Sequence, residues 1–116
     1  MLKESQLSDP AKLLAYLEKL EKKITTQKVE RYFANQPPRI LNEYLVLSGD
    51  LKLLVAKLRV KQLKNITDRI NVHTKELVDR SAELDTELKS LSSARKTLSR
   101  LNKIVSVVSR IALPFL

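Results

Sequence analysis

The sequence has no cysteine, no tryptophan, one glycine and one histidine in 116 residues. Without cysteine there is no disulfide bond, no thiolate nucleophile and none of the usual zinc sites, and one histidine cannot build a metal centre alone. Two phenylalanines and three tyrosines are few for a sheet protein, which also needs glycine in its turns. We therefore expect an all-α protein without a metal or another cofactor.

Long hydrophobic runs are also absent. The first ten residues are polar and charged, so they lack the apolar centre of a secretory signal. The most apolar stretch, 104–116, contains Arg110 and Pro114 and is shorter than the roughly 20 residues that span a bilayer. We expect a cytoplasmic protein without a transmembrane helix. Its hydrophobic content of 43% is enough for one modest core, so residues 1–116 should form a single domain.

The first part of the chain predicts a helix over about 10–34. Asp9 is a good N-cap, and Pro10 suits the first helical position. The apolar pattern weakens near Thr26 but resumes before the Pro37-Pro38 pair, which predicts a turn. This helix is expected to fold back on the next one as an N-terminal helical hairpin or small bundle.

The second part predicts one long, coiled-coil-like helix over about 38–112, kinked at Gly49 or broken near 65–71. From residue 50 to residue 112 it has no proline or glycine, and an apolar residue recurs every seventh position. The repeat contains Leu63, Ile70, Leu77, Leu84, Leu91, Leu98, Val105 and Ala112. Such a stripe must be buried against other helices.

Between residues 51 and 66 this helix has apolar residues on two sides. One side contains Leu51, Leu54, Val55, Leu58 and Ile66, and the other Leu53, Ala56, Val60 and Leu63. The first helix can cover only one of them, so we expect a homo-oligomer through the long helix. The alternative is a chain reversal near 65–71, which would supply a third helix internally, although no glycine or proline marks it.

The C-terminal segment combines an apolar face with basic residues and has no acid after Glu87. Such a segment can lie on an anionic membrane surface or dock on an acidic protein, and Pro114 would leave the apolar tip free. The residues expected to make this contact are Arg100, Lys103, Ile104, Val108, Arg110, Ile111 and Phe115. The alternative is that the same face is simply the seam of a coiled coil.

A net charge of +9 also makes nucleic acid a candidate partner. Lys57, Lys61 and Lys64 form one row along the helix, which could follow a phosphate backbone or be neutralised by Glu18 and its neighbours. No aromatic residue in this row would stack on bases, so such binding would not depend on sequence.

Catalytic groups are not indicated. His73 is isolated from other ligands, and the carboxylates between residues 76 and 87 resemble a solvated helix face. We expect no enzyme activity and no small-molecule substrate. The favoured interpretation is a helical scaffold that self-associates in the cytoplasm, peripherally bound to a membrane or an acidic partner. The alternative is a small basic nucleic-acid-binding protein.

Overall fold

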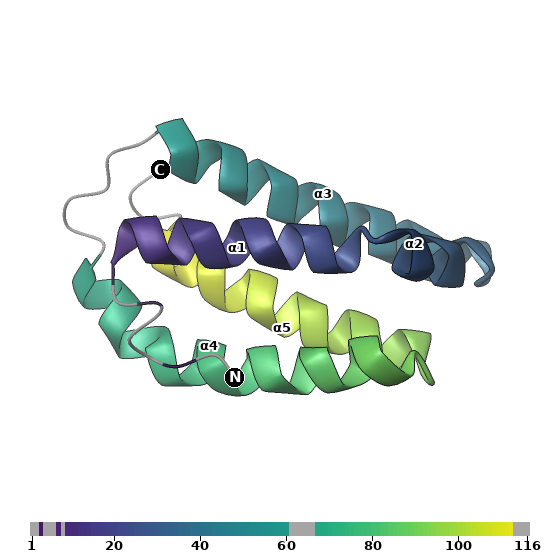
Figure 1. Cartoon of the computed structure of the whole chain (residues 1–116). Helices are drawn as coiled ribbons and strands as arrows, with labels where there is room; N and C mark the ends of the chain where they lie inside the picture. The colour runs from purple at the N-terminus through teal and green to yellow at the C-terminus, as the bar shows by residue number, and fades with distance from the viewer. Residues whose placement is uncertain (1–2, 4–6, 8, 61–66, 113–116) are drawn as a thin grey trace.

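The computed structural model describes residues 3, 7, 9–60 and 67–112, and the regular structure over these residues is helical, without strands (Figure 1). The helices are α1 (Pro10–Ile24), α2 (Gln27–Ala34), α3 (Pro38–Val60), α4 (Thr67–Ser90) and α5 (Ala94–Ala112). The predicted all-α class is therefore confirmed. The described part measures 42 × 26 × 20 Å, much shorter than the rod that one helix over 38–112 would form.

The four longer helices surround one core. Helix α1 packs against α3, α3 against α5, and α5 against α4, while α4 also touches α1 and closes the ring. Helices α1 and α4 run in one direction, and α3 and α5 run in the other (Figure 1). The short helix α2 lies against α3 and α1 at one end of the bundle. Helix α5 therefore packs on α3 within the chain, where the sequence left the third helix either to a second copy or to a chain reversal.

The first predicted helix is in fact two helices. The Asp9 carboxylate accepts a hydrogen bond from the Lys12 amide at 2.9 Å, and Pro10 occupies the first turn, as expected. Helix α1 ends at Ile24, and the hydroxyl of Thr26 caps α2 by accepting from the Val29 amide at 3.3 Å. The weakening of the apolar pattern near Thr26 therefore marks a real helix boundary.

Helix α3 begins at Pro38 and continues through Gly49 to Val60 without a break. The carbonyl of Pro37 accepts the amides of Ile40 and Leu41, which places the turn at the predicted proline pair. Gly49 does not have a positive φ, so the helix tolerates it as an ordinary interior residue.

The continuous helix expected over 38–112 is not confirmed, because three separate helices occupy that range. Helices α3 and α4 run in opposite directions, so the chain reverses between them, close to the alternative break at 65–71 (Figure 1). Helix α4 begins only at Thr67, and residues 61–66 lie outside the described residues. A second break, which the sequence did not predict, separates Ser90 from Ala94. Leu91 has a left-handed backbone with φ 44°, and the Ser93 hydroxyl caps α5 by accepting from the Lys96 amide at 3.2 Å. The left-handed Leu91 thus ends α4 and the Ser93 cap begins α5, without glycine or proline.

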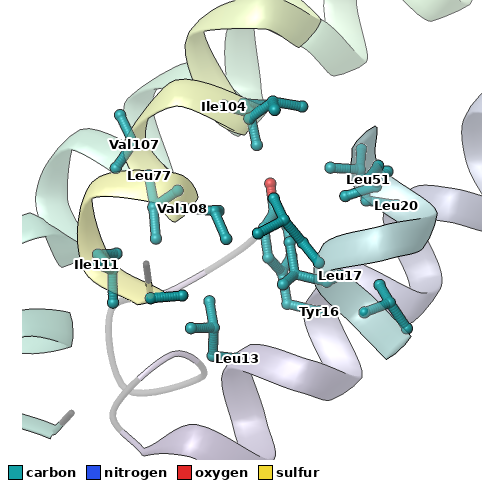
Figure 2. Packing of buried hydrophobic residues seen from close by; sticks show 14 of the residues in the cluster. Leu13, Tyr16, Leu17, Leu20, Leu51, Leu77, Ile104, Val107, Val108 and Ile111 are labelled. Atoms are coloured by element: carbon teal, nitrogen blue, oxygen red, sulfur yellow. The ribbon is translucent and has the colours of Figure 1, made fainter. Parts of the chain in front are cut away.

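The heptad stripe contributes largely to the intramolecular core. Its described members are buried except Leu91, which lies at the turn between α4 and α5. The buried members are Ile70, Leu77, Leu84, Leu98, Val105 and Ala112. Burying one such leucine or isoleucine stabilises the fold by about 1.5–3 kcal/mol. Figure 2 shows this core, in which side chains of α1, α3, α4 and α5 converge.

Candidate functional site

The apolar face of the C-terminal segment is part of the core. Ile104, Val108 and Ile111 are each 0% exposed and belong to the main hydrophobic cluster. Figure 2 shows them together with Leu13, Leu17 and Tyr16 of α1. The proposed membrane-binding side chains therefore face inward, and a bilayer could reach them only if the bundle opened. Phe115 lies outside the described residues.

Two cations of the same segment pair with acids of α4. Arg100 donates to Glu83 at 2.7 Å, and Arg110 donates to Glu76 at 3.3 Å. Glu83 also accepts from Arg80 at 3.3 Å. The hairpin sets α5 directly against the acidic face of α4, so these two basic residues, expected to contact a membrane or an acidic partner, have acidic neighbours within the chain. Lys103 is half-buried and has no ion pair with a described residue.

The lysine row is only partly described. Lys57 is exposed on α3, whereas Lys61 and Lys64 lie outside the described residues. Arg59, which extends the basic surface, donates to Glu18 of α1 at 3.2 Å. One cation of this surface is therefore neutralised internally, as the alternative interpretation expected.

His73 lies beside one acidic side chain of its own helix. Its Nδ1 atom lies 3.8 Å from a carboxylate oxygen of Glu76, one turn away on the same helix. Among the described residues, no group of three or more histidine, aspartate or glutamate side chains could hold a metal ion. Likewise, no described helix is both long and apolar enough to span a bilayer.

Tyr16 and Tyr44 are buried in the packed interior. Burial raises the pKa of Tyr16 to about 12, with smaller effects from Ser81 and Asp85 of α4. Burial also raises the pKa of Tyr44, whose hydroxyl donates to the Ile24 carbonyl at 2.6 Å. A neutral phenol held in an apolar interior stabilises packing, and neither ring lies in an open cleft.

A surface groove lies between the N-terminal halves of α3 and α5 and has a volume of about 890 Å³. Its apolar lining includes Ile40, Val46 and Leu98, and its guanidinium groups come from Arg39 and Arg95. The remaining lining residues are Asn42, Glu43, Leu47, Ser99 and Asn102. Both arginines are exposed, and neither side chain pairs with a described residue. Sequence reasoning missed this groove because it forms only when α3 and α5 lie side by side.

The outer face of α3 is apolar and open to solvent. Leu45, Val46 and Leu53 are 56%, 61% and 55% exposed, and Ala56 is exposed beside them. The opposite side of the helix is the core side, with Leu51, Leu54, Val55 and Leu58 buried. The prediction that α3 is apolar on two sides thus agrees with the structure, although Val60 and Leu63 cannot be placed on either side.

No protein-family model, curated protein or solved structure matches this chain. The described surface has two partly apolar regions, the groove between α3 and α5 and the outer face of α3.

Proposed function

We propose that this chain is a non-enzymatic helical interaction protein that docks an acidic amphipathic helix of a partner in the groove between α3 and α5. The observation that carries the proposal is the combination of an apolar lining with two arginines, Arg39 and Arg95, that pair with none of the described residues. Compared with the sequence-based hypothesis, the acidic partner is kept, but its contact moves from the apolar C-terminal face, which is buried, to this groove.

The electrostatics of the groove favour an anionic partner. Helices α3 and α5 run in the same direction, so their N-terminal ends lie at the same end of the bundle (Figure 1). Neither helix has an acidic residue in its first turn, and each carries an arginine there. A cation at a helix N-terminus opposes the macrodipole by about 0.3–1 kcal/mol, so carboxylates of a partner would relieve an unfavourable arrangement. Glu43 is the one acid in the lining, against two arginines.

The apolar lining favours a helix with a leucine stripe over a fully charged chain. Ile40 and Leu98 are buried beneath the groove, and Val46 stands exposed at its side. A groove between two parallel helices can accept the side chains that an amphipathic helix presents at successive turns. The short polar side chains of Ser99 and Asn102 leave room for that helix. The proposed partner is therefore both acidic and amphipathic.

The test is binding of a fluorescent synthetic helix with leucines on one face and glutamates on the others. The double variant Arg39→Glu with Arg95→Glu should raise its Kd at least about tenfold, because two attractive contacts become repulsive. The matched control is Lys19→Glu with Lys22→Glu on α1, which changes net charge by the same amount on exposed residues outside the groove. Equal losses in the two double variants would reduce the interaction to general charge attraction and contradict the groove proposal.

Nucleic acid remains the second candidate, favoured by the net charge of +9 and the exposed Lys57. A scrambled peptide of the same composition, random-sequence DNA and anionic vesicles separate the alternatives in the same assay. Tight DNA binding that both double variants weaken equally, and that salt abolishes, would replace the proposal with sequence-independent nucleic-acid binding. Vesicle binding accompanied by loss of helix packing would indicate a bundle that opens to expose Ile104 and Val108.

A further inference from the structure

The residues on the outer face of α3 are arranged nearly symmetrically about Gly49. At about 100° per residue, positions three, four and seven residues away lie on the same side of a helix as the central residue. Leu45 and Leu53 lie four residues before and after Gly49, and Asn42 and Ala56 lie seven before and after it. All five are exposed. The face therefore presents a small central residue flanked on each side by an exposed leucine.

Gly49 is not explained by the fold of one chain. It lies inside a continuous helix, where glycine costs roughly 1 kcal/mol relative to alanine. It has no positive φ, and an added Cβ atom would meet nothing within 4 Å. The monomer would thus tolerate a larger residue at this position. A missing side chain between two exposed leucines is useful where another backbone approaches closely.

We infer that this face binds a second copy of the chain, with the two α3 helices antiparallel and related by a twofold axis at Gly49. In such a contact, a residue that precedes Gly49 by some number of positions lies opposite the residue of the other copy that follows Gly49 by the same number of positions. Leu45 of each copy then packs on Leu53 of the other, and the two glycines allow the backbones to approach. Two leucine pairs become buried that the monomer leaves more than half exposed.

The charges beside the apolar face fit this arrangement. Glu43 and Lys57 lie on the same flank of α3, both are exposed, and neither has an ion pair with a described residue. Antiparallel pairing about Gly49 brings Glu43 of one copy within side-chain reach of Lys57 of the other, twice per dimer. Parallel pairing would instead set Glu43 against Glu43 and Lys57 against Lys57. Asp50 and its symmetry mate stay at the rim, where water and salt screen them.

Two substitutions test whether the outer face of α3 mediates dimerisation. Leu53→Ser should shift the 116-residue chain from dimer to monomer in sedimentation equilibrium, raising the dimer Kd at least about tenfold, and its circular dichroism should stay that of a helical bundle. Gly49→Leu should raise the thermal midpoint of the monomer, because leucine is the better helix former, and yet weaken dimerisation by blocking close approach. The control is Val72→Ser, which alters a side chain 77% exposed on α4 and should leave the dimer intact.

The orientation is tested by cross-linking, which the absence of natural cysteine makes unambiguous. When equal amounts of Leu45→Cys and Leu53→Cys chains are mixed and oxidised, the mixed disulfide between residues 45 and 53 should exceed the two homodimeric products taken together, because random pairing would give it only an equal share. Predominant 45 to 45 and 53 to 53 products would overturn the antiparallel arrangement. A wild-type chain that sediments as a monomer at 200 µM, or a dimer that survives Leu53→Ser and Gly49→Leu unchanged, would overturn the inference altogether.

Discussion

Arg100 of α5 donates a 2.7 Å hydrogen bond to Glu83 of α4, joining the two arms of the C-terminal hairpin. Arg80 donates to the same carboxylate at 3.3 Å, so Glu83 holds two guanidinium groups that would otherwise repel each other. All three side chains are about one-third exposed, which makes the network stronger than a fully solvated ion pair.

Replacing Glu83 with glutamine should therefore destabilise the hairpin. The free energy of unfolding, measured with urea, should fall by about 1–2 kcal/mol, because the charge-assisted hydrogen bonds weaken and two like charges remain. Glu87→Gln is the matched control, since Glu87 has no ion pair with a described residue. The loss should shrink at high salt, and an equal effect of the two substitutions would contradict the network.

Burial of Tyr16 predicts that the stability of the fold decreases at alkaline pH. Its pKa in the folded chain is about 12, above the ordinary value of 10.0, so the contribution of the neutral phenol is complete below pH 10. This contribution is lost as the pH rises from 10 towards 12, and amounts to about 2–3 kcal/mol. In Tyr16→Phe this loss should be absent. Urea unfolding of both proteins between pH 8 and pH 11 checks it, and parallel curves would refute it.

Leu84 and Leu91 occupy equivalent heptad positions but have different environments. Leu84 is 0% exposed in the core, whereas Leu91 is only half-buried and forms the left-handed turn between α4 and α5. Leu84→Ala should cost about 2–5 kcal/mol of unfolding free energy, and Leu91→Ala less than about 1 kcal/mol. Comparable losses in thermal or urea unfolding would favour the uninterrupted coiled coil that the sequence suggested.

Tyr44 links the second, smaller hydrophobic cluster to the end of α1. Its ring stacks on Phe33 at 4.3 Å between centroids, and its hydroxyl donates to the Ile24 carbonyl at 2.6 Å. Tyr44→Phe keeps the stacked ring but leaves a buried carbonyl without this donor, so about 1–2 kcal/mol of stability should be lost. Tyr32→Phe, at a half-buried tyrosine whose hydroxyl has no described partner, is the control. No difference between the two in urea unfolding would contradict a structural role for this hydrogen bond.

Local signals in the sequence predicted helix starts well. Asp9-Pro10 and Pro37-Pro38 mark the beginnings of α1 and α3, because an N-cap and a first-turn proline act through their immediate neighbours. The break after Ser90 was missed, since Ser-Leu-Ser-Ser contains neither of the usual breaking residues and Leu91 adopts a backbone that leucine seldom takes.

The tertiary arrangement was less predictable. A heptad of apolar residues is buried equally well in a coiled coil between chains and in a bundle within one chain, so the periodicity of Leu77 and Leu84 cannot distinguish them. The ion pair between Arg100 and Glu83 could not be predicted for the same reason, because the two side chains meet only after the chain reverses between α4 and α5. The two-sided character of α3 was predictable, since it needs only the helical period. The groove between α3 and α5 was not, because it depends on which helices are neighbours.

Leu7 precedes the first helix and yet is completely buried in the main core with Leu13 and Leu17. The part of the chain required for a well-packed bundle therefore extends beyond its helices. A recombinant version trimmed to begin at the Asp9 cap would keep α1 to α5 and still leave a leucine-sized hole. Affinity tags and fluorescent labels for the experiments above are better placed ahead of Met1, with the segment through Leu7 retained.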